Sequence, residues 1–221
     1  MNTTSRADRP KRMSPGERER SILDGAIALA RESGLEVLTV RAVASRVGVT
    51  PALIAHYRPV MDEFVAEVFG AIVSAEREEV LGGFEASGDL RANLQGLIET
   101  LLDTTRDDVA LIWVQSWSLG ARNEVLGRRV RHEMDLWQSG LEEVIRRASD
   151  GAVDPAPAAW LLLAMVDGMS AHSLVKWAPR DRADLARRTL AAVLGHEEEM
   201  TAARAPHAAS PARRHPAEPE M

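Results

Sequence analysis

Two very short helical segments within residues 39–57 constrain the fold of this chain most strongly. In the stretch TVRAVASRVGVTPALIAHY the apolar residues recur at helical spacing, stop at Gly48 and resume after Thr50 and Pro51. Helices of this length bury little surface and are marginal in water on their own. The rest of the chain must therefore supply a scaffold on which both of them pack.

The composition favours helices as that scaffold. Of the 221 residues, 45% are hydrophobic but only 4% are aromatic, so a core must be built mainly from Leu, Val, Ile, Ala and Met. β-Sandwiches favour β-branched and aromatic strand residues, and no segment here alternates with the period of a strand. We therefore predict an all-α protein with about nine helices.

Caps and breakers place the first three helices. Ser14-Pro15-Gly16-Glu17 reads as a capping box for the first helix, which should end at Gly34. Thr39 can cap the second helix, which Gly48 closes. Thr50 and Pro51 begin the third, which ends before Pro59 because the residue before a proline avoids the helical conformation.

The remaining sequence predicts six more helices and two disordered ends. The helices are expected at about 61–81, 89–104, 107–117, 124–148, 155–177 and 181–194. We predict four parts: a disordered basic arm (1–13), a three-helix domain (14–60), a larger helical domain (61–195) and a disordered tail (196–221).

Charge is distributed unevenly along the chain. The formal net charge is -6, yet residues 1–60 carry ten Lys and Arg against six Asp and Glu, so the remainder is at -10. A basic first quarter on an acidic body is expected when only that quarter contacts nucleic acid.

Several classes of protein are excluded or disfavoured by the residues. There is no cysteine, so disulfides and thiolate metal sites are excluded. The first residues lack the apolar segment of a secretory signal, and the longest apolar run, AAWLLLAMV at 158–166, is too short to span a membrane. No catalytic motif or metal-ligand spacing is present, RHEMD at 131–135 having a single His. We expect a cytoplasmic protein that is not an enzyme and needs no cofactor or metal.

The stretch at 40–57 satisfies the steric demands of a helix-turn-helix. Val43, Val47, Val49, Ile54 and Tyr57 occupy the inward positions, while Ala44 is small where two helices cross. Gly48 stands in the turn, which needs a positive φ that glycine adopts without strain. The alternative is a buried helical hairpin of a bundle; the N-terminal position and basic surroundings favour DNA binding.

In a helix-turn-helix the outer face of the second short helix enters the major groove. Here that face would present Thr50, Pro51, Ala52, Ala55 and His56, while Thr39 and Arg41 begin the preceding helix and can contact the DNA backbone. Tyr57 and Arg58 complete the predicted DNA-binding set. No Arg, Asn or Gln lies on the outer face, so thymine methyl groups and DNA shape are the expected readout.

The residues from Ser14 to Val68, above all LTVRAVASRVGVTPALIAHY, resemble the TetR family of bacterial transcriptional regulators. The stretch LIWVQSWSLGARNEVLGRRVRHEMDLW at 111–137 resembles the C-terminal domain of the BetI-like branch. The resemblance implies a helix-turn-helix domain followed by a helical dimerisation and ligand domain. It also implies a repressor that a small molecule releases from its operator.

Three positions depart from the family pattern. Arg58 follows Tyr57 where the family usually has an aromatic residue, Met61 replaces a lysine that contacts phosphate, and Ala55 replaces a frequent tyrosine. If Arg58 reaches phosphate, Phe64 or another side chain must fill the vacated packing space. These departures bear on the individual DNA contacts and not on the fold.

The helix at 155–177 is apolar nearly all round, so both of its faces should be buried. In a chain of this size a second subunit is the natural cover, and two-fold symmetry is the common arrangement. The resemblance implies pairing through 155–177 and 181–194. A two-fold dimer would recognise a palindromic operator.

The tryptophans allow two interpretations. Trp113, Trp117 and Trp137, with Asp167 and His172, would suit a pocket for an organic cation, because aromatic faces attract cations. Tryptophans at helical spacing are more often core residues, however, and His172 more often belongs to an interface. We therefore predict a small-molecule effector but leave its identity open.

The whole reading is a sequence-specific, DNA-binding homodimeric regulator that acts as a repressor on a double-stranded operator. The alternative is a helical interaction or ligand-binding protein that does not bind DNA. Salt dependence distinguishes the two, because neutralising several phosphates makes the affinity for DNA fall steeply with salt concentration.

Overall fold

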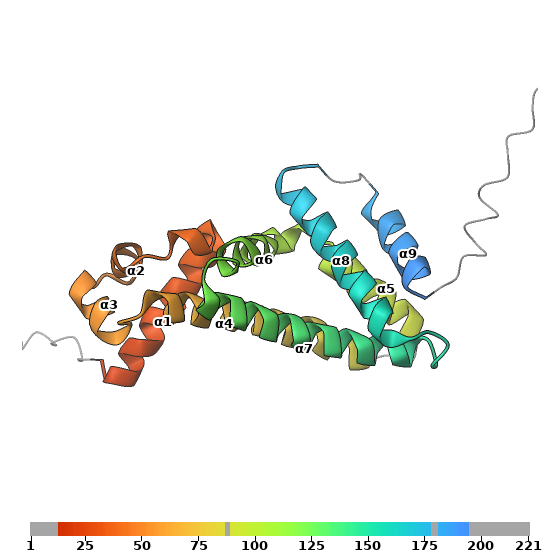
Figure 1. Ribbon diagram of the computed structural model, residues 1–221, viewed down its shortest axis with the longest axis horizontal. Helices are drawn as coiled ribbons and strands as arrows, with labels where there is room; N and C mark the ends of the chain where they lie inside the picture. Colours follow the sequence, from red (N-terminus) through yellow and green to blue (C-terminus); the bar gives the residue numbers. More distant parts are fainter. Residues whose placement is uncertain (1–12, 87–88, 178–180, 195–221) are drawn as a thin grey trace, which may run out of the picture.

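The computed structural model describes residues 13–86, 89–177 and 181–194, and this part of the chain is helical without a strand (Figure 1). The α-helices are α1 (Pro15–Ser33), α2 (Val40–Val47), α3 (Pro51–Tyr57), α4 (Met61–Gly82), α5 (Leu90–Leu101), α6 (Asp107–Gly120), α7 (Glu124–Ala148), α8 (Pro155–Leu174) and α9 (Arg182–Val193). Short 3-10 helices follow α1, α4 and α5: η1 (Leu35–Val37), η2 (Gly83–Ala86) and η3 (Thr104–Arg106). The all-α prediction is confirmed. The predicted disordered ends, apart from Met13, lie outside the described residues.

The predicted caps form as the residue types require. The Ser14 hydroxyl accepts from the Glu17 amide at 3.3 Å, and the Glu17 carboxylate accepts from the Ser14 amide at 2.7 Å. The Thr39 hydroxyl accepts from the Ala42 amide at 3.1 Å at the start of α2. These bonds satisfy amides that have no partner within the helix.

Two helices end earlier than the sequence pattern predicted. α5 ends at Leu101, because the Asp103 carboxylate accepts from the Thr105 amide at 2.7 Å and so begins η3. α8 ends at Leu174, before Trp177, because Lys176 adopts a left-handed φ of 59°. The amide of Trp177 then donates back to the His172 carbonyl at 3.0 Å, which closes the helix.

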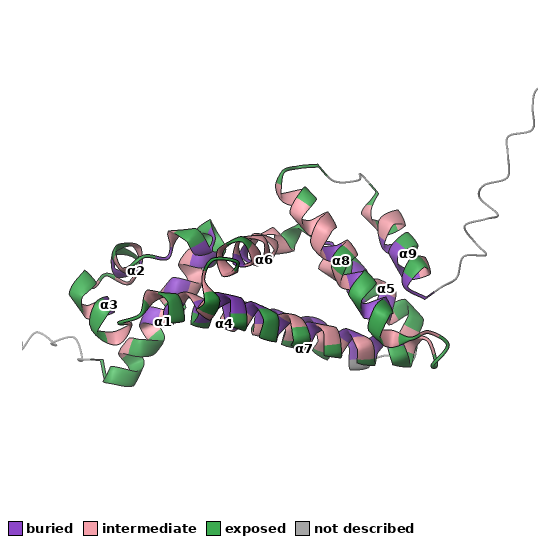
Figure 2. Cartoon of the chain, in the orientation of Figure 1, coloured by how far each residue is buried: buried purple, intermediate pink, exposed green. Residues whose placement is uncertain are grey.

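The buried residues form two clusters. The first joins α1, α2 and α3 to α4, to the first half of α6 and to the start of α7. The second joins α5, the end of α7, α8 and α9. In Figure 2 the buried stripe follows α4 and α7, which run side by side along the molecule. The short helices are therefore packed on the same scaffold that carries the C-terminal helices.

A buried carboxylate lies where α7 packs on α4. Glu133 of α7, 1% exposed, accepts at 2.6 Å from the guanidinium of Arg129, one turn earlier in the same helix, and the Arg77 guanidinium of α4 lies 3.9 Å away. Gly70 makes room for Arg129, because a β-carbon there would overlap the guanidinium. Removing one partner of such a pair leaves an uncompensated charge and is costly.

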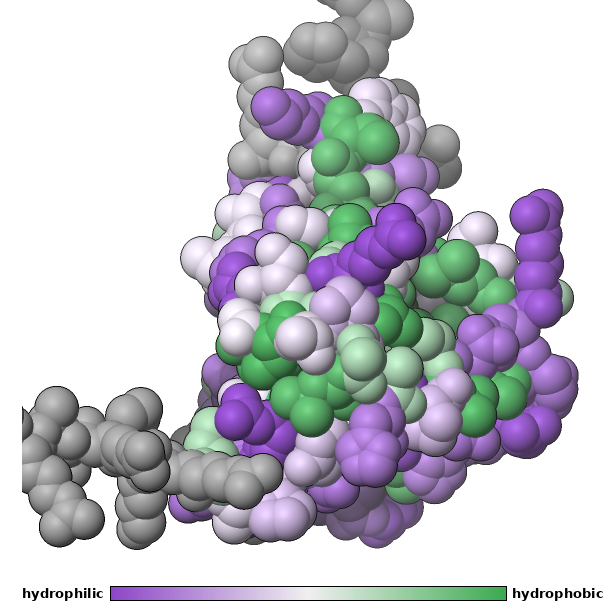
Figure 3. Space-filling model, turned by 90° about the vertical axis from the view of Figure 1, so that its left-hand side faces the viewer, coloured by the Kyte–Doolittle hydropathy of each residue, from purple (hydrophilic) through white to green (hydrophobic). Residues whose placement is uncertain are grey.

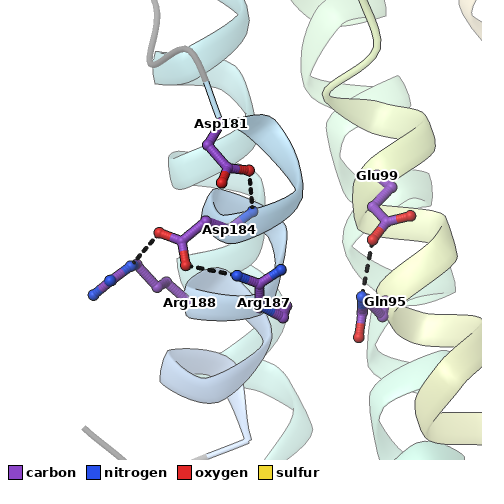
Figure 4. A network of polar contacts seen from close by, with 6 residues as sticks. All are labelled: Gln95, Glu99, Asp181, Asp184, Arg187 and Arg188. Carbon is purple, nitrogen blue, oxygen red and sulfur yellow. Dashed lines mark hydrogen bonds and ion pairs between the residues drawn. The ribbon is translucent and has the colours of Figure 1, made fainter. Parts of the chain in front are cut away.

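Exposed polar contacts support α5 and α9 (Figure 4). The Asp181 carboxylate caps α9 by accepting from the Asp184 amide at 2.8 Å. Asp184 in turn accepts from Arg187 at 2.8 Å and from Arg188 at 2.6 Å, and the bond from Arg188 lowers the pKa of the Asp184 carboxyl group.

Among the described helices, none is both long and apolar enough to cross a membrane.

Candidate DNA-recognition surface and effector cavity

The turn between α2 and α3 has the predicted geometry. Gly48 lies in the left-handed region at φ 72°, and the Val49 amide donates to the Ala44 carbonyl at 2.9 Å. Val43, Ala44 and Ile54 are buried, and Val47, Val49 and Tyr57 pack partly buried against the same core. Because these side chains point inward, the opposite face of α3 is free.

Most of the predicted DNA-contacting residues lie on that free surface. The exposed members are Thr39, Arg41, Thr50, Pro51, Ala52, Ala55 and His56. Thr39 and Thr50 also cap α2 and α3, because their hydroxyls accept from backbone amides at 3.1 and 3.3 Å. Figure 3 views the molecule from this end, where hydrophilic residues are interspersed with small apolar patches.

Tyr57 and Arg58 differ from the rest of the predicted DNA-binding set, because both side chains pack against other residues of the protein. Tyr57 packs against the core and meets the His56 ring edge-on, with the centroids 5.3 Å apart. The Arg58 guanidinium lies 5.0 Å from the centroid of the Phe64 ring and 3.4 Å from Glu67. In this conformation Arg58 is paired within the protein, and the buried Phe64 fills the core beside it.

An ion pair that was not predicted from the sequence holds α2 against α1. Arg46 donates two hydrogen bonds to Glu32, at 2.6 and 2.5 Å, and these bonds lower the pKa of the Glu32 carboxyl group. Beside this ion pair the two helices pack closely, since a β-carbon on Gly25 would lie 2.5 Å from Cγ2 of the Val47 side chain. Both contacts hold α2 in place against α1.

A cavity of about 80 Å³ lies among the C-terminal helices. This volume is several times the roughly 10–15 Å³ that one water molecule needs, so a small ligand fits. Its apolar and aromatic lining includes Trp113, Val114 and Trp117 of α6, Met134 and Trp137 of α7, and Leu163, Val166 and Met169 of α8. Four of the five residues predicted for a pocket, Trp113, Trp117, Trp137 and Asp167, line this cavity.

His172 does not belong to the cavity lining. It is exposed on α8 and meets the Trp177 ring edge-on, with the centroids 4.8 Å apart. The structure thus places His172 at the surface of α8, outside the residues that line this cavity, and a contact of His172 with an effector stays a prediction.

Glu76 of α4 is the buried acid at the cavity wall and was missed by sequence reasoning. Its side chain is 6% exposed; Arg106 donates to one carboxylate oxygen at 2.6 Å and the Trp113 indole to the other at 3.2 Å. A signal was available, because Glu76 occupies an inward position in the apolar stripe of α4 together with Phe69, Ile72, Val73 and Val80.

Asp167 of α8 is a second acid of the lining; it is partly buried and has no hydrogen-bond or ion-pair partner among the described residues. Burial, and then the negative charge of Glu76, raises the pKa of the Asp167 carboxyl group to about 7. The lining carries four carboxyl groups, from Glu76, Asp103, Asp107 and Asp167, against the guanidinium groups of Arg106 and Arg182. With all of these groups ionised the cavity is net negative and favours a cation.

The indoles give the cavity both rings and hydrogen-bond donors. Trp113 and Trp117 lie with centroids 6.1 Å apart, and Phe69 meets Trp113 edge-on at 5.2 Å. The indole nitrogens of Trp117 and Trp137 are buried without an acceptor. In the described part of the chain no group of three or more His, Asp or Glu side chains is placed to hold a metal ion.

An exposed helix-turn-helix and a buried cavity on one helical scaffold define a DNA-binding transcriptional regulator. Comparison with known families agrees: residues 22–68 match the bacterial regulatory proteins of the tetR family, and residues 90–197 match the C-terminal domain of BetI-type transcriptional repressors. The chain belongs to the TetR family. This family consists of transcriptional regulators, which are not enzymes.

Individual relatives are distant but cover most of the chain. The HTH-type transcriptional regulator BetI of Escherichia coli strain K12 is 24% identical over 177 residues, covering 78% of this chain and 90% of the relative. A transcriptional regulator of Pseudomonas aeruginosa PAO1 has a similar structure, with a TM-score of 0.69 and 22% identity over 86% of this chain and 96% of that one.

A second solved structure has a similar fold. A transcriptional regulator of Saccharomonospora viridis, solved in complex with choline, has a TM-score of 0.68 and 23% identity. The similarity covers 82% of this chain and 97% of that one. It supports the same fold for both proteins.

Proposed function

We propose that this protein is a homodimeric repressor that binds a palindromic operator and leaves it when a small organic cation enters the cavity. The observation that carries the choice of effector is the unpartnered Asp167 beside the indoles of Trp113, Trp117 and Trp137. Aromatic faces attract cations, by about 0.5–2 kcal/mol per ring depending on exposure. The choline complex of the S. viridis regulator supports the same class of ligand.

The outer face of α8 supports a dimer. Trp160 is 65% exposed and Leu161 is 42% exposed, and Val175 and Trp177 are exposed at the other end of the segment. Large apolar side chains exposed along one segment favour an interface, and a second copy of 155–177 with 181–194 would cover them. The two copies of α3 would then meet two half-sites about one helical turn apart, or a multiple of it.

Release from the operator would be a shift of population. A ligand that binds better to the dimer in which the two α3 helices no longer match the half-sites weakens DNA binding by its difference in affinity for the two forms. A regulator of bacterial genes meets its operator in the cytoplasm, which is the compartment we propose.

The experiment is a selection of duplexes from a random pool at moderate salt, followed by titration of the selected duplex with choline chloride. The proposal expects a palindrome and a weaker affinity for DNA once choline binds. Failure to enrich any sequence would overturn the operator proposal. An enriched palindrome whose affinity is unchanged by bound choline would overturn the effector proposal alone.

A further inference from the structure

Helix α6 has one side in the cavity and another on the DNA-binding end. Trp113 and Trp117, one turn apart, line the cavity, whereas Gln115 lies between them in sequence and therefore on a different side of the helix. In Figure 1, α6 lies between the α1–α3 region and the upper end of α8. A displacement of α6 would therefore affect the cavity and the DNA-binding helices at the same time.

The Gln115 side chain holds the chain where α1 ends. Its carbonyl oxygen accepts from the Leu35 amide at 2.5 Å, a contact between residues 80 positions apart. The carboxamide also fills the space beside Gly34: a β-carbon there would lie 2.8 Å from its Cδ. Gly34 has φ 87°, so glycine is needed for its backbone as well.

The segment held by Gln115 leads directly into the helix-turn-helix. η1 follows Gly34, Leu35 and Leu38 are buried, and Thr39 caps α2. A second contact joins the same two helices, since Arg31 near the end of α1 lies 3.6 Å from Asp108 of α6. That pair is partly exposed and is screened by solvent and salt, so the Gln115 contact is the more directional link.

We propose that Gln115 is the positioning residue through which occupancy of the cavity reaches the DNA-binding helices. This inference rests on the proposed effector. A ligand that pushes the Trp113 and Trp117 side of α6 outward moves Gln115 with it. Because a hydrogen bond of 2.5 Å weakens steeply once it lengthens by about 1 Å or bends, a small displacement is enough to release Leu35. The η1 turn, and α2 behind it, then lose one of their fixed points.

The test compares Gln115→Met with Gln115→Glu. Methionine keeps the approximate length but removes the acceptor, whereas glutamate keeps an acceptor oxygen for the Leu35 amide. Ser118→Ala, an exposed position on α6, is the matched control, and Gln115→Ala replaces the methionine variant if that variant does not fold. Each protein is titrated with the selected operator, once in the presence and once in the absence of choline. In a separate experiment each protein is titrated with choline alone.

In the wild type and in Ser118→Ala we expect choline to weaken operator binding at least about fivefold, the lower end of common allosteric coupling. In Gln115→Met the ratio should fall to about twofold or less while choline affinity stays within about twofold, and Gln115→Glu should restore the ratio. A methionine variant with the wild-type ratio would overturn the inference. The inference would also be overturned if Gln115→Met weakened operator binding equally with and without choline. The ratio would then be unchanged, as expected for a residue that only supports the structure.

Hydrogen exchange separates this inference from the effector proposal. Coupling is reciprocal, so operator binding should change amide exchange in 107–120 of the wild type and of Gln115→Glu, but not of Gln115→Met. If choline does not bind the wild type, the effector proposal fails, and this comparison still decides the role of Gln115. Equal changes in all three proteins would overturn it.

Discussion

The Trp113 indole donates a hydrogen bond to Glu76 at 3.2 Å, across the contact between α6 and α4. With Arg106 on the other carboxylate oxygen at 2.6 Å, both oxygens of Glu76 have partners. Asp167, which lines the same cavity, has no such partner. Under the proposed function, Glu76 holds the cavity wall and Asp167 meets the ligand.

Asp167→Asn should change how stability depends on pH. Because the pKa of Asp167 is raised from 3.8 to about 7, the native state keeps a proton that the unfolded chain has already lost between these two values. The free energy of unfolding of the wild type, relative to the asparagine variant, should therefore fall as pH rises from about 4 to about 7. Urea unfolding at several pH values measures it.

Asp184→Asn is the control, because its effect on the pH dependence of the free energy of unfolding should have the opposite sign. Its pKa is lowered, first by the bond from Arg188, so its contribution is present at neutral pH and is lost as the medium becomes acidic. A flat difference between wild type and Asp167→Asn from pH 4 to 7 would show that Asp167 does not titrate as its burial requires.

Trp117→Leu should weaken the binding of a cation in the cavity more than it lowers the stability of the fold. The leucine keeps apolar contacts, but the ring that lies 6.1 Å from Trp113 is lost. We expect the Kd for choline to rise by about 2- to 30-fold, which corresponds to roughly 0.5–2 kcal/mol. Calorimetric titration measures it, with Ser118→Ala on the exposed side of α6 as the control. An unchanged Kd would place the cation away from the α6 rings.

Gly48→Ala should destabilise the helix-turn-helix through its backbone alone. Gly48 has φ 72°, and nothing lies within 4 Å of an added β-carbon, so the cost is the left-handed conformation, roughly 1–2 kcal/mol. Gly96→Ala, in the middle of α5 with equally open space, should stabilise by up to about 1 kcal/mol. The midpoint of urea unfolding measures both. Equal effects of the two substitutions would contradict the turn geometry.

Trp160→Glu should convert the dimer into a monomer. The substitution places a charge in the exposed apolar face of α8, where a second subunit would have to bury it without a partner. Sedimentation at micromolar concentration should give half the wild-type mass, whereas Ala92→Glu on the exposed side of α5 should leave the dimer intact. A monomeric wild type, or a dimer that survives Trp160→Glu, would argue against this interface.

Local features of the fold could be read from the sequence. Ser14 and Thr39 cap helices as predicted, Thr50 precedes α3 where the third helix was expected to begin, and Gly48 adopts the expected positive φ. These features depend on residues within one turn of each other, so the sequence alone carries them. The early end of α5 was missed because Asp103 was not recognised as a cap: its carboxylate accepts from the Thr105 amide and begins η3.

The site was less predictable because it depends on contacts distant in sequence. Trp113 and Trp117 could be placed on one face of α6, but their pairing with Glu76 needed the crossing of α4 and α6. The Gln115 contact with Leu35 leaves no pattern in either segment. Arg58 could be read as a phosphate contact, yet the three-dimensional position of Glu67 gives it a partner within the protein.

The measurement that tests the central claim most directly is titration of the selected operator with Arg41→Ala, His56→Ala and the control Arg131→Ala, an exposed arginine of α7. We predict that Arg41→Ala weakens binding to all sequences and lowers the salt slope by about one. His56→Ala should reduce the preference for the palindrome, and Arg131→Ala should bind as the wild type does. If all three variants bound alike, the surface of α2 and α3 would not be the DNA-binding surface of this protein.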